Sequence, residues 1–253
     1  MSKGSVTLTT NKNGLATIEF YHPMSNSLPG AILSQLAQTI TDAGNDENIR
    51  VILLQSSGDR TFCAGASFEE LSKIKNFEEG KKFFMGFANV INAARKCPKL
   101  IIGRVQGKAV GGGVGMASAV DYCIATKYAS VKLSELALGI GPFVVGPAVE
   151  RKIGTSSMST MAINATKWYS AEWAKTKGLY AEVFENASEM DEHINELSLK
   201  LANSNPEATK ALKEIFWEGT ESWDDLLDKR ASISGKLILS TYSSNAINAI
   251  KNK

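Results

Sequence analysis

Apolar and polar residues alternate near the start of the chain, on both sides of the dipeptide Asn13-Gly14. The alternation over residues 6–10 and 15–20 has the period of two that half-buried strands show. Asn-Gly adopts the positive φ angles of a tight hairpin turn with little strain. The pattern therefore predicts that the chain opens with a β-hairpin.

Two unbroken apolar runs farther along, over residues 51–56 and 100–105, indicate strands that are covered on both faces. Between the hairpin and the first run, apolar positions recur at helical spacing over residues 32–43, and a second amphipathic helix is predicted over residues 83–94. This alternation of strands and helices is typical of an α/β core.

The chain becomes mostly helical after two further strand-like segments at residues 122–126 and 131–133. Helices are predicted near residues 147–153, 156–164, 171–177, 189–203, 206–217, 222–235 and 240–250. Residues 76–80 are expected to form a mobile, solvated loop. We expect an α/β core domain over residues 1–190 and a helical C-terminal lobe over residues 191–253.

The composition fits an ordinary globular protein with a substantial core, since 43% of the 253 residues are hydrophobic and 21% are charged. The net charge of +2 lacks the strong basic field of a nucleic-acid binder. No apolar stretch reaches the roughly 18 residues that span a bilayer. We therefore expect a cytoplasmic protein without a membrane or nucleic-acid partner.

The cysteines and histidines are few and far apart. Cys63, Cys97 and Cys123 are expected to be buried, reduced thiols rather than a disulfide framework or a zinc site. His22 and His193 are the only histidines, which gives little support to a metal site or a serine triad. Surface or loop roles are expected for both histidines, and no metal is expected.

Three consecutive glycines, Gly111, Gly112 and Gly113, follow a predicted buried strand and open a predicted helix. Glycine lets the backbone approach a ligand closely, and a helix start offers unpaired N–H groups and partial positive charge. A second glycine-bearing loop, over residues 62–67, also connects a strand to a helix. The two loops could aim two N–H groups at one oxyanion. The alternative is that both loops only permit tight turns.

Glu135 is the best acid–base candidate because apolar residues such as Leu133 and Leu136 flank it. Apolar surroundings disfavour the charged carboxylate and raise its pKa, which suits proton transfer near neutral pH. The alternative is a carboxylate that caps the turn after its strand.

Together these motifs resemble the crotonase, or enoyl-CoA hydratase/isomerase, superfamily. The matching segments are residues 62–66, Gly107, residues 111–113 and 121–125, and Leu133-Ser134-Glu135 with Leu138-Gly139. Their order and spacing match over nearly the whole chain, from Pro23 to about Arg230. The resemblance implies an α/β fold with a ββα spiral core, and a helical C-terminal lobe that assembles a homotrimer or a dimer of trimers.

Carried over by position, the resemblance implies that the N–H groups of Ala66 and Gly112 bind the thioester oxygen of an acyl-coenzyme A substrate. It makes Glu135 one of two catalytic carboxylates of the typical hydratase. Coenzyme A enters as part of the substrate, so no separate cofactor is implied. The substrate-binding positions expected around these three residues are Met24, Ser25, Asn26, Cys63, Ala64, Ser67, Phe68, Gly111, Gly115, Ser134 and Phe143.

Two positions depart from the family pattern: Gly115 stands where the second carboxylate is usual, and Ser67 stands where aspartate is usual. With Glu135 alone a proton can still be moved between carbons, as in the superfamily's single-glutamate isomerases. Residues 113–116 and 141–144 most resemble the methylglutaconyl-CoA hydratase branch. Hydration of a branched enoyl-CoA such as methylglutaconyl-CoA is the first expectation. Double-bond isomerisation and a non-catalytic acyl-CoA-binding or RNA-associated member are the alternatives.

Overall fold

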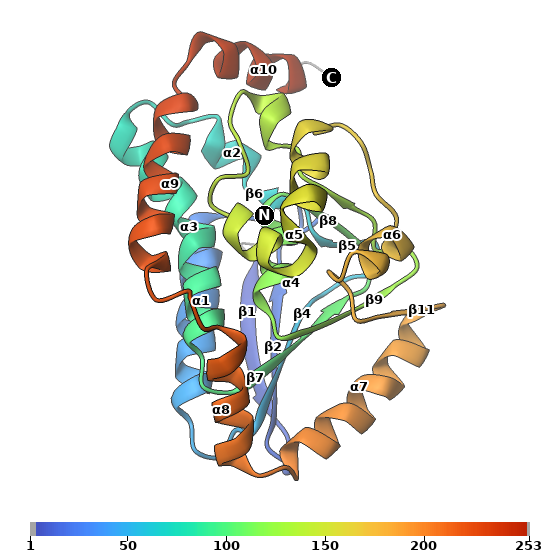
Figure 1. The fold of residues 1–253 in the computed structure, drawn as a ribbon. Coiled ribbons are helices and arrows are strands. Elements are labelled where there is room, and N and C mark those ends of the chain that lie inside the picture. Colours follow the sequence, from blue (N-terminus) through green and yellow to red (C-terminus); the bar gives the residue numbers. More distant parts are fainter. Residues whose placement is uncertain (1–3, 252–253) are drawn as a thin grey trace.

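A twisted six-stranded sheet forms the centre of the molecule in the computed structural model, which describes residues 4–251 (Figure 1). Its strands, in spatial order, are β1 (Ser5–Thr10), β2 (Leu15–Tyr21), β4 (Val51–Ser56), β7 (Leu100–Val105), β9 (Tyr122–Thr126) and β11 (Glu182–Phe184). β1 and β2 pair antiparallel, and each later neighbouring pair is parallel. The predicted hairpin and the predicted buried strands are confirmed. β11 was not predicted, because this short, half-buried segment becomes a strand only by pairing with β9.

Helices cover both faces of this sheet. Ile52 and Leu54 of β4 belong to the main core, together with residues of α1 (Gly30–Asn45) and α3 (Phe77–Lys96). The alternate residues Val51 and Leu53 pack instead with α7 (Ala187–Ala202) on the opposite face. The continuous apolar run of β4 follows from this burial on two sides.

Small parallel sheets beside the main one carry the loops that matter for function. One contains β10 (Val131–Lys132), β8 (Lys108–Val110) and β5 (Thr61–Cys63), and the other contains β3 (Ser27–Leu28) and β6 (Gly65–Ala66). Three short helices follow these strands: α2 (Phe68–Leu71), α4 (Gly112–Ala119) and the 3-10 helix η1 (Glu135–Leu138). The helix predicted at Gly112 is confirmed.

The C-terminal part is helical, as predicted. Its helices are α5 (Gly146–Ile163), α6 (Ala171–Thr176), α7, α8 (Pro206–Phe216), α9 (Trp223–Leu237) and α10 (Thr241–Lys251). Gly154, with φ 72°, interrupts α5 between the two predicted helical stretches. α7 crosses the expected domain boundary and packs on the sheet through Met190 and Ile194. His193 of the same helix is half-buried, with its ring 5.2 Å from that of Phe184.

The prediction of a loop at residues 76–80 is wrong, because α3 already begins at Phe77. Asn76 caps this helix, and its side chain accepts a hydrogen bond of 2.9 Å from the N–H of Glu79. Gly80 is buried against α9, where a Cβ atom would lie 2.8 Å from the carbonyl oxygen of Gly235. The polar residues at the start of α3 and the glycine at its crossing with α9 are residue types that are also common in loops, which explains the wrong prediction.

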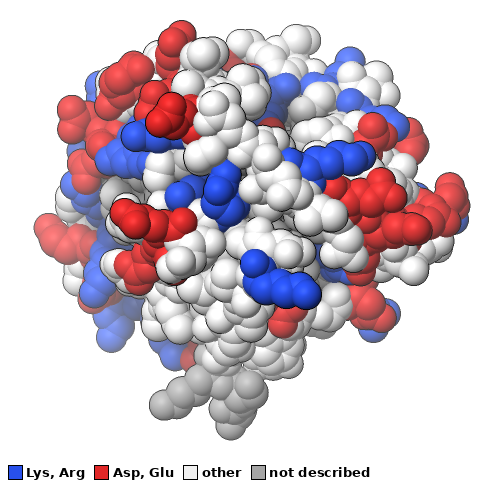
Figure 2. All heavy atoms as spheres, turned by 90° about the horizontal axis from the view of Figure 1, so that it is seen from below, with Lys and Arg blue, Asp and Glu red and all other residues white. Residues whose placement is uncertain are grey.

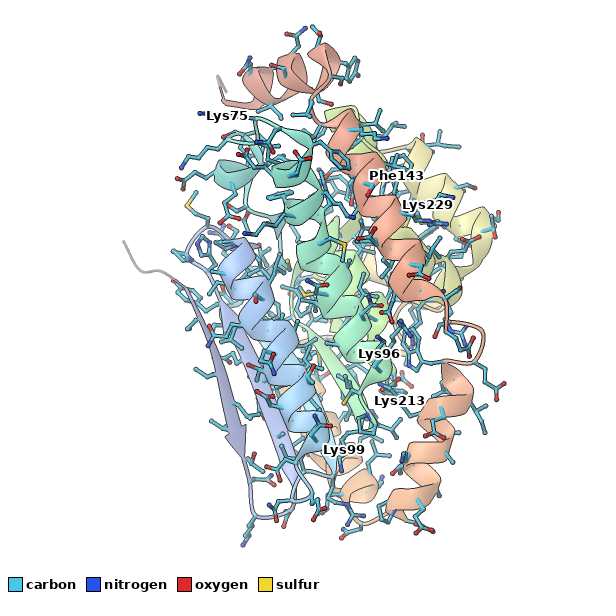
Figure 3. All side chains as sticks on the ribbon, turned by 90° about the vertical axis from the view of Figure 1, so that its left-hand side faces the viewer. Lys75, Lys96, Lys99, Phe143, Lys213 and Lys229 are labelled. Atoms are coloured by element: carbon cyan, nitrogen blue, oxygen red, sulfur yellow. The ribbon has the colours of Figure 1, made fainter. Side chains whose placement is uncertain are left out.

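A buried ion pair ties α8 to the sheet. The ammonium of Lys213, a residue labelled in Figure 3, lies 2.7 Å from Oδ2 of Asp121, and it also donates to the carbonyl oxygen of Ala94 at 2.9 Å. The Ile101 N–H donates to Oδ2 of Asp121 at 2.8 Å, and the Trp217 indole donates to Oδ1 at 2.8 Å. Each oxygen of this buried carboxylate therefore has a donor.

Charges of both signs are mixed on the face of the molecule that is seen from below in Figure 2. Figure 2 shows Lys and Arg intermingled with Asp and Glu on the lower face of the molecule. Within residues 4–251, no helix is long and apolar enough to cross a bilayer. The described residues also contain no group of three or more His, Cys, Asp or Glu side chains that could hold a metal ion.

Candidate active site

A cavity of about 1750 Å³ lies at the start of α4, bordered by the loops that follow β5, β8 and β10. Ala66, Gly112 and Glu135 all line it. Of the other predicted site residues, the cavity is lined by Met24, Ala64, Ser67, Phe68, Gly111, Ser134 and Phe143. Residues 25, 26, 63 and 115 do not line it. Segments up to 227 residues apart in sequence thus meet around one space, since the lining extends from His22 to Ala249.

The two glycine-bearing loops touch each other through their backbones. A Cβ atom on Gly65 would lie 3.2 Å from the carbonyl oxygen of Val110 and 3.9 Å from the nitrogen of Gly112. Gly65 and Gly111 have φ angles of 92° and 52°, which L side chains rarely adopt. Gly112 is the first residue of α4, so its N–H has no partner within the helix. Ala66 and Gly112 consequently share one wall of the cavity.

Asn26 supports this wall from behind rather than lining it, because the residue is 3% exposed. Its amide donates to the carbonyl oxygens of Ser57 and Thr61, each at 3.0 Å. Its Oδ1 accepts from the His22 N–H at 2.8 Å. Ser25 precedes it in the same left-handed turn, with φ 53°, and is exposed outside the cavity. Both residues hold the loop that carries Met24 to the cavity mouth.

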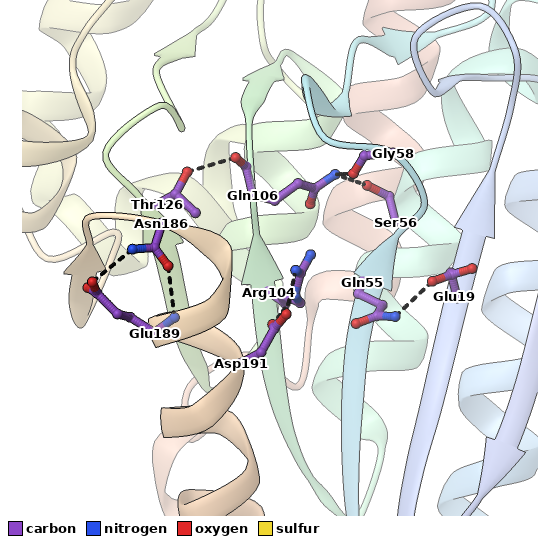
Figure 4. Close-up of polar contacts among 10 residues, drawn as sticks. All are labelled: Glu19, Gln55, Ser56, Gly58, Arg104, Gln106, Thr126, Asn186, Glu189 and Asp191. Carbon is purple, nitrogen blue, oxygen red and sulfur yellow. Dashed lines mark hydrogen bonds and ion pairs between the residues drawn. The ribbon is translucent and has the colours of Figure 1, made fainter.

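Gln106, which directly follows β7, anchors the segment between β4 and β5, to which the Asn26 amide also bonds (Figure 4). The Gln106 side chain donates to Ser56 Oγ and to the Gly58 carbonyl oxygen, both at 2.9 Å. The backbone carbonyl oxygen of Gln106 accepts from Thr126 Oγ1 at 2.7 Å. These bonds join the main sheet to the segment that leads into β5.

Cys63 and Ser67 flank the first glycine-bearing loop and have structural contacts of their own. The Cys63 sulfur is buried and accepts from the Gly65 N–H at 3.3 Å. Burial raises the pKa of this thiol to about 12, which keeps it neutral. Ser67 lines the cavity and caps α2, since its hydroxyl accepts from the Glu70 N–H at 3.3 Å. The three cysteines are free and buried, as predicted.

Glu135 begins η1 and directs its carboxyl group toward the second glycine-bearing loop. A Cβ atom on Gly111 would lie only 3.0 Å from Glu135 Oε1, so a side chain at residue 111 would press on the carboxyl group. Glu135 is half-buried as a residue, but its Oε2 atom is buried and has no hydrogen-bond partner among the described residues. Burial raises the pKa of Glu135 to about 7, and backbone hydrogen bonds at Glu135 and Ser134 oppose the shift.

Gly115 does not reach the cavity, because Val145 covers it. A Cβ atom on Gly115 would lie 2.5 Å from Cγ1 of Val145 and 2.8 Å from its Cβ. Val145 itself is buried and lines the cavity. The volume beside Gly115 is therefore occupied by a valine side chain. Glu69, the other carboxylate of the described lining, is an exposed residue 2.6 Å from Lys73.

Aromatic side chains of α3 complete the cavity and were not predicted as site residues. Phe83, Phe84 and Phe87 all line it, and a Cβ atom on Gly112 would collide with the Phe87 ring. Phe143 lies behind α9 in Figure 3 and reaches the cavity from the segment before α5. Helical spacing marked the α3 residues only as buried, since core and pocket walls share the same pattern. Chemically, the site combines one carboxyl group of raised pKa, backbone donors and apolar walls.

Comparison with known proteins gives a consistent picture. The enoyl-CoA hydratase/isomerase family model matches residues 10–247. A probable enoyl-CoA hydratase of Bacillus subtilis is 27% identical over 241 residues, covering 94% of this chain and 93% of that protein. The peroxisomal Delta(3,5)-Delta(2,4)-dienoyl-CoA isomerase of Arabidopsis thaliana is 24% identical over 240 residues, covering 88% of this chain and 84% of that protein.

Among solved structures, an enoyl-CoA hydratase from Bacillus halodurans superposes with a TM-score of 0.88 at 22% identity, covering 96% of this chain and 99% of the other. The predicted crotonase-like α/β fold is thereby confirmed. Relatives named as hydratases and as isomerases both occur, so the similarity leaves the reaction open.

Proposed function

Because the chain belongs to the enoyl-CoA hydratase/isomerase family, we propose that it stabilises the enolate of an acyl-CoA thioester while Glu135 moves a proton. The backbone N–H groups of Ala66 and Gly112 would hold the thioester oxygen. Both residues share one cavity wall, and a preorganised donor of this kind contributes roughly 3–4 kcal/mol in a dry site. A carboxyl group with a pKa of about 7 can accept and return a proton at neutral pH.

Double-bond isomerisation is the reaction that this geometry supports best. The observation that carries the proposal is Val145, whose side chain fills the space beside Gly115 where a second carboxylate would stand. Glu135 would remove a proton from the carbon next to the thioester carbonyl of a 3-enoyl-CoA. The electron pair of that C–H bond forms the dienolate, whose oxygen the two N–H groups hold. Glu135 then returns the proton to the carbon at the far end of the dienolate, which yields the 2-enoyl-CoA.

Hydration is the second candidate, and the names of relatives such as the Bacillus subtilis protein favour it. In that reaction Glu135 would direct water to the double bond of a 2-enoyl-CoA, and the enolate would form at the same two N–H groups. Hydration of methylglutaconyl-CoA, the first expectation from the sequence, belongs to this candidate. A site with one carboxylate must then position the water without a second one.

Incubation with matched 2-enoyl- and 3-enoyl-CoA thioesters, followed by mass spectrometry and ultraviolet spectroscopy, separates the candidates. We expect conversion of the 3-enoyl to the 2-enoyl thioester without change of mass. A gain in mass of one water molecule from the 2-enoyl thioester would identify a hydratase instead. Tight binding of every thioester with no conversion would leave an acyl-CoA-binding protein and overturn the proposed enzyme.

We also propose that the C-terminal helices contact other copies of the chain in a trimer or a dimer of trimers. Large apolar side chains are exposed on α8 and α9 and just beyond them: Leu212, Ile215, Phe216, Ile233, Leu237 and Leu239. Burial of these side chains against another copy of the chain would be favourable. Light scattering of the full chain should give at least the mass of a trimer, and a monomer at micromolar concentration would contradict this assembly.

A further inference from the structure

One side of the cavity is built without a single charged side chain. From α3 it is lined by phenylalanines, and from the segment after η1 by aliphatic and aromatic residues; α9 and α10 add small residues. These lining residues are Phe83, Phe84, Phe87, Leu138, Ile140, Gly141, Pro142, Phe143, Val144, Val145, Ser234, Ala246 and Ala249. The apolar wall, as we call this set, contains one hydroxyl group and no ionisable group.

The apolar wall runs from the proposed thioester seat toward the last helix. It starts at Gly112, over which the Phe87 ring packs. One helical turn earlier on α3, the rings of Phe83 and Phe84 meet edge to face at 5.1 Å. These two rings share an apolar cluster with Ile247 of α10. α10 lies across the end of the molecule in Figure 1, above α2 and the upper end of α9.

The wall is held in place by its own packing. Gly80 of α3 and Gly235 of α9 are in backbone contact, with a Cβ atom on Gly80 only 2.9 Å from the Cα of Gly235. The neighbouring residue Ser234 is 1% exposed and lines the cavity. Arg230 donates to the carbonyl oxygen of Phe143 at 3.3 Å, which ties the segment before α5 to α9. Because α3, α9 and the Phe143 segment are joined, the wall forms a preformed surface.

The charged groups that line the cavity lie outside the apolar wall, although Glu135 shares η1 with Leu138. Glu69 lies on α2, and Lys73 follows this helix. The Lys73 ammonium is 2.6 Å from Oε1 of Glu69, and both side chains are well exposed. Lys132 of β10 lies 4.5 Å from the centre of the Trp168 ring. Glu135 faces Gly111. Arg230 lies behind the wall, outside the cavity lining, and already donates to the Phe143 carbonyl oxygen. A carboxylate carried into the space along the apolar wall would therefore meet no cation among the described lining residues of that wall, and burying an unpaired charge is strongly unfavourable.

We infer that the substrate's acyl group is an uncharged hydrocarbon chain longer than crotonyl, which extends from Gly112 past the α3 phenylalanines to α10. This inference rests on the proposed action on acyl-CoA thioesters, and it names their acyl class. Each methylene that the chain buries along the wall should raise apparent affinity about fourfold. A carboxylate at the same place should lower it.

Two comparisons of substrates test the inference in the wild-type protein. Dissociation constants are measured for crotonyl-, hexenoyl-, octenoyl- and decenoyl-CoA, and kcat/KM is measured for the 3-enoyl thioesters of the same four chain lengths. Dissociation constants are then compared for methylcrotonyl-CoA and methylglutaconyl-CoA, which differ by one carboxylate. We expect affinity to rise along the series, and the carboxylated thioester to bind at least about 30-fold more weakly than its uncharged partner. Equal or tighter binding of methylglutaconyl-CoA, or a preference for crotonyl-CoA, would overturn the inference.

A variant pair locates the far end of the chain at α10. Ala246→Trp narrows the cavity where α10 lines it, and Asn248→Trp adds the same bulk at an exposed position of the same helix. We expect Ala246→Trp to lower the ratio of kcat/KM for 3-decenoyl-CoA to that for 3-butenoyl-CoA by about 10-fold, and Asn248→Trp to leave that ratio unchanged. An unchanged ratio in Ala246→Trp would overturn the role of α10.

The binding measurements keep this inference separate from the proposed function. If no thioester is converted but affinity still rises with chain length, the proposed reaction fails and the acyl class stands. If conversion occurs but shows no preference for longer chains, the acyl class fails and the proposed reaction stands.

Discussion

Asp121 and Glu135 are both shielded carboxyl groups, yet their surroundings differ completely. The Asp121 side chain is 4% exposed, and both of its oxygens accept hydrogen bonds, from Lys213, Trp217 and Ile101. Glu135 Oε2 is equally removed from solvent but has no partner within the described residues. The first carboxylate has a cation and two further donors, whereas burial raises the pKa of the second one to about 7.

The difference separates a structural charge from a carboxyl group that we propose for proton transfer. Donors from a strand and from α8 converge on Asp121, so that its charge joins the C-terminal helices to the sheet. Glu135 faces glycine backbone instead, which has no side chain that could neutralise it. The Glu135 carboxyl group, whose Oε2 has no partner among the described residues, lowers the free energy of unfolding at neutral pH. Such a loss of stability is common at functional sites.

The largest expected effect is on turnover. Glu135→Gln keeps the shape of the side chain but removes its ability to accept a proton, so we expect kcat to fall by about 10²–10⁴-fold. Binding of an enoyl-CoA, measured by calorimetry, should change only a few-fold. Glu218→Gln, at an exposed glutamate outside the cavity lining, serves as the matched control and should keep wild-type kcat. Retained turnover in Glu135→Gln would remove Glu135 from the chemistry.

The second-largest effect is on the free energy of unfolding and concerns Asp121. Lys213→Met leaves the charge of Asp121 buried without its cation, and we expect the free energy of unfolding to fall by about 3–5 kcal/mol in urea titrations. Adding Asp121→Asn removes the stranded charge and should recover part of the loss. Lys127→Met breaks an exposed ion pair with Glu185 and should cost less than about 1 kcal/mol. A similarly small loss in Lys213→Met would mean that the buried pair is not structural.

The smallest effect has the opposite sign and distinguishes the two carboxylates most clearly. Because folding raises the pKa of Glu135 from 4.5 to about 7, the folded protein holds this proton more tightly than the unfolded chain, and stability falls as the pH rises through this interval. Above pH 7 the loss amounts to about 3 kcal/mol. Glu135→Gln should therefore raise the free energy of unfolding at alkaline pH, and the gain should vanish below pH 4.5. A lower free energy of unfolding for Glu135→Gln at alkaline pH would contradict this expectation and would mean that the charged Glu135 makes a stabilising interaction.

Much of the fold could be predicted because its signals are local. The alternating strands around Gly14, the buried run over residues 51–56 and the glycines at 111–113 each carry a period or a backbone requirement that sequence spacing displays. Glu135 could be singled out as a candidate because its neighbours in sequence are apolar. The roles of Ala66 and Gly112 followed from family resemblance, and they stay proposals until the experiments above are done.

The remaining features depend on contacts between residues that lie far apart in sequence. Gly115 stands thirty residues before Val145, and only the folded chain shows that the valine occupies the space beside the glycine. Asn26 appeared to be a ligand contact but turns inward, because its amide bonds to carbonyl oxygens of the loop before β5. Gly80 looked like part of a loop until α9 was seen to pack on it. The sequence by itself determined which elements form and where a buried carboxyl group could lie, since those depend on neighbouring residues. The tertiary structure decided which side chains share a cavity, because that depends on close packing between distant segments.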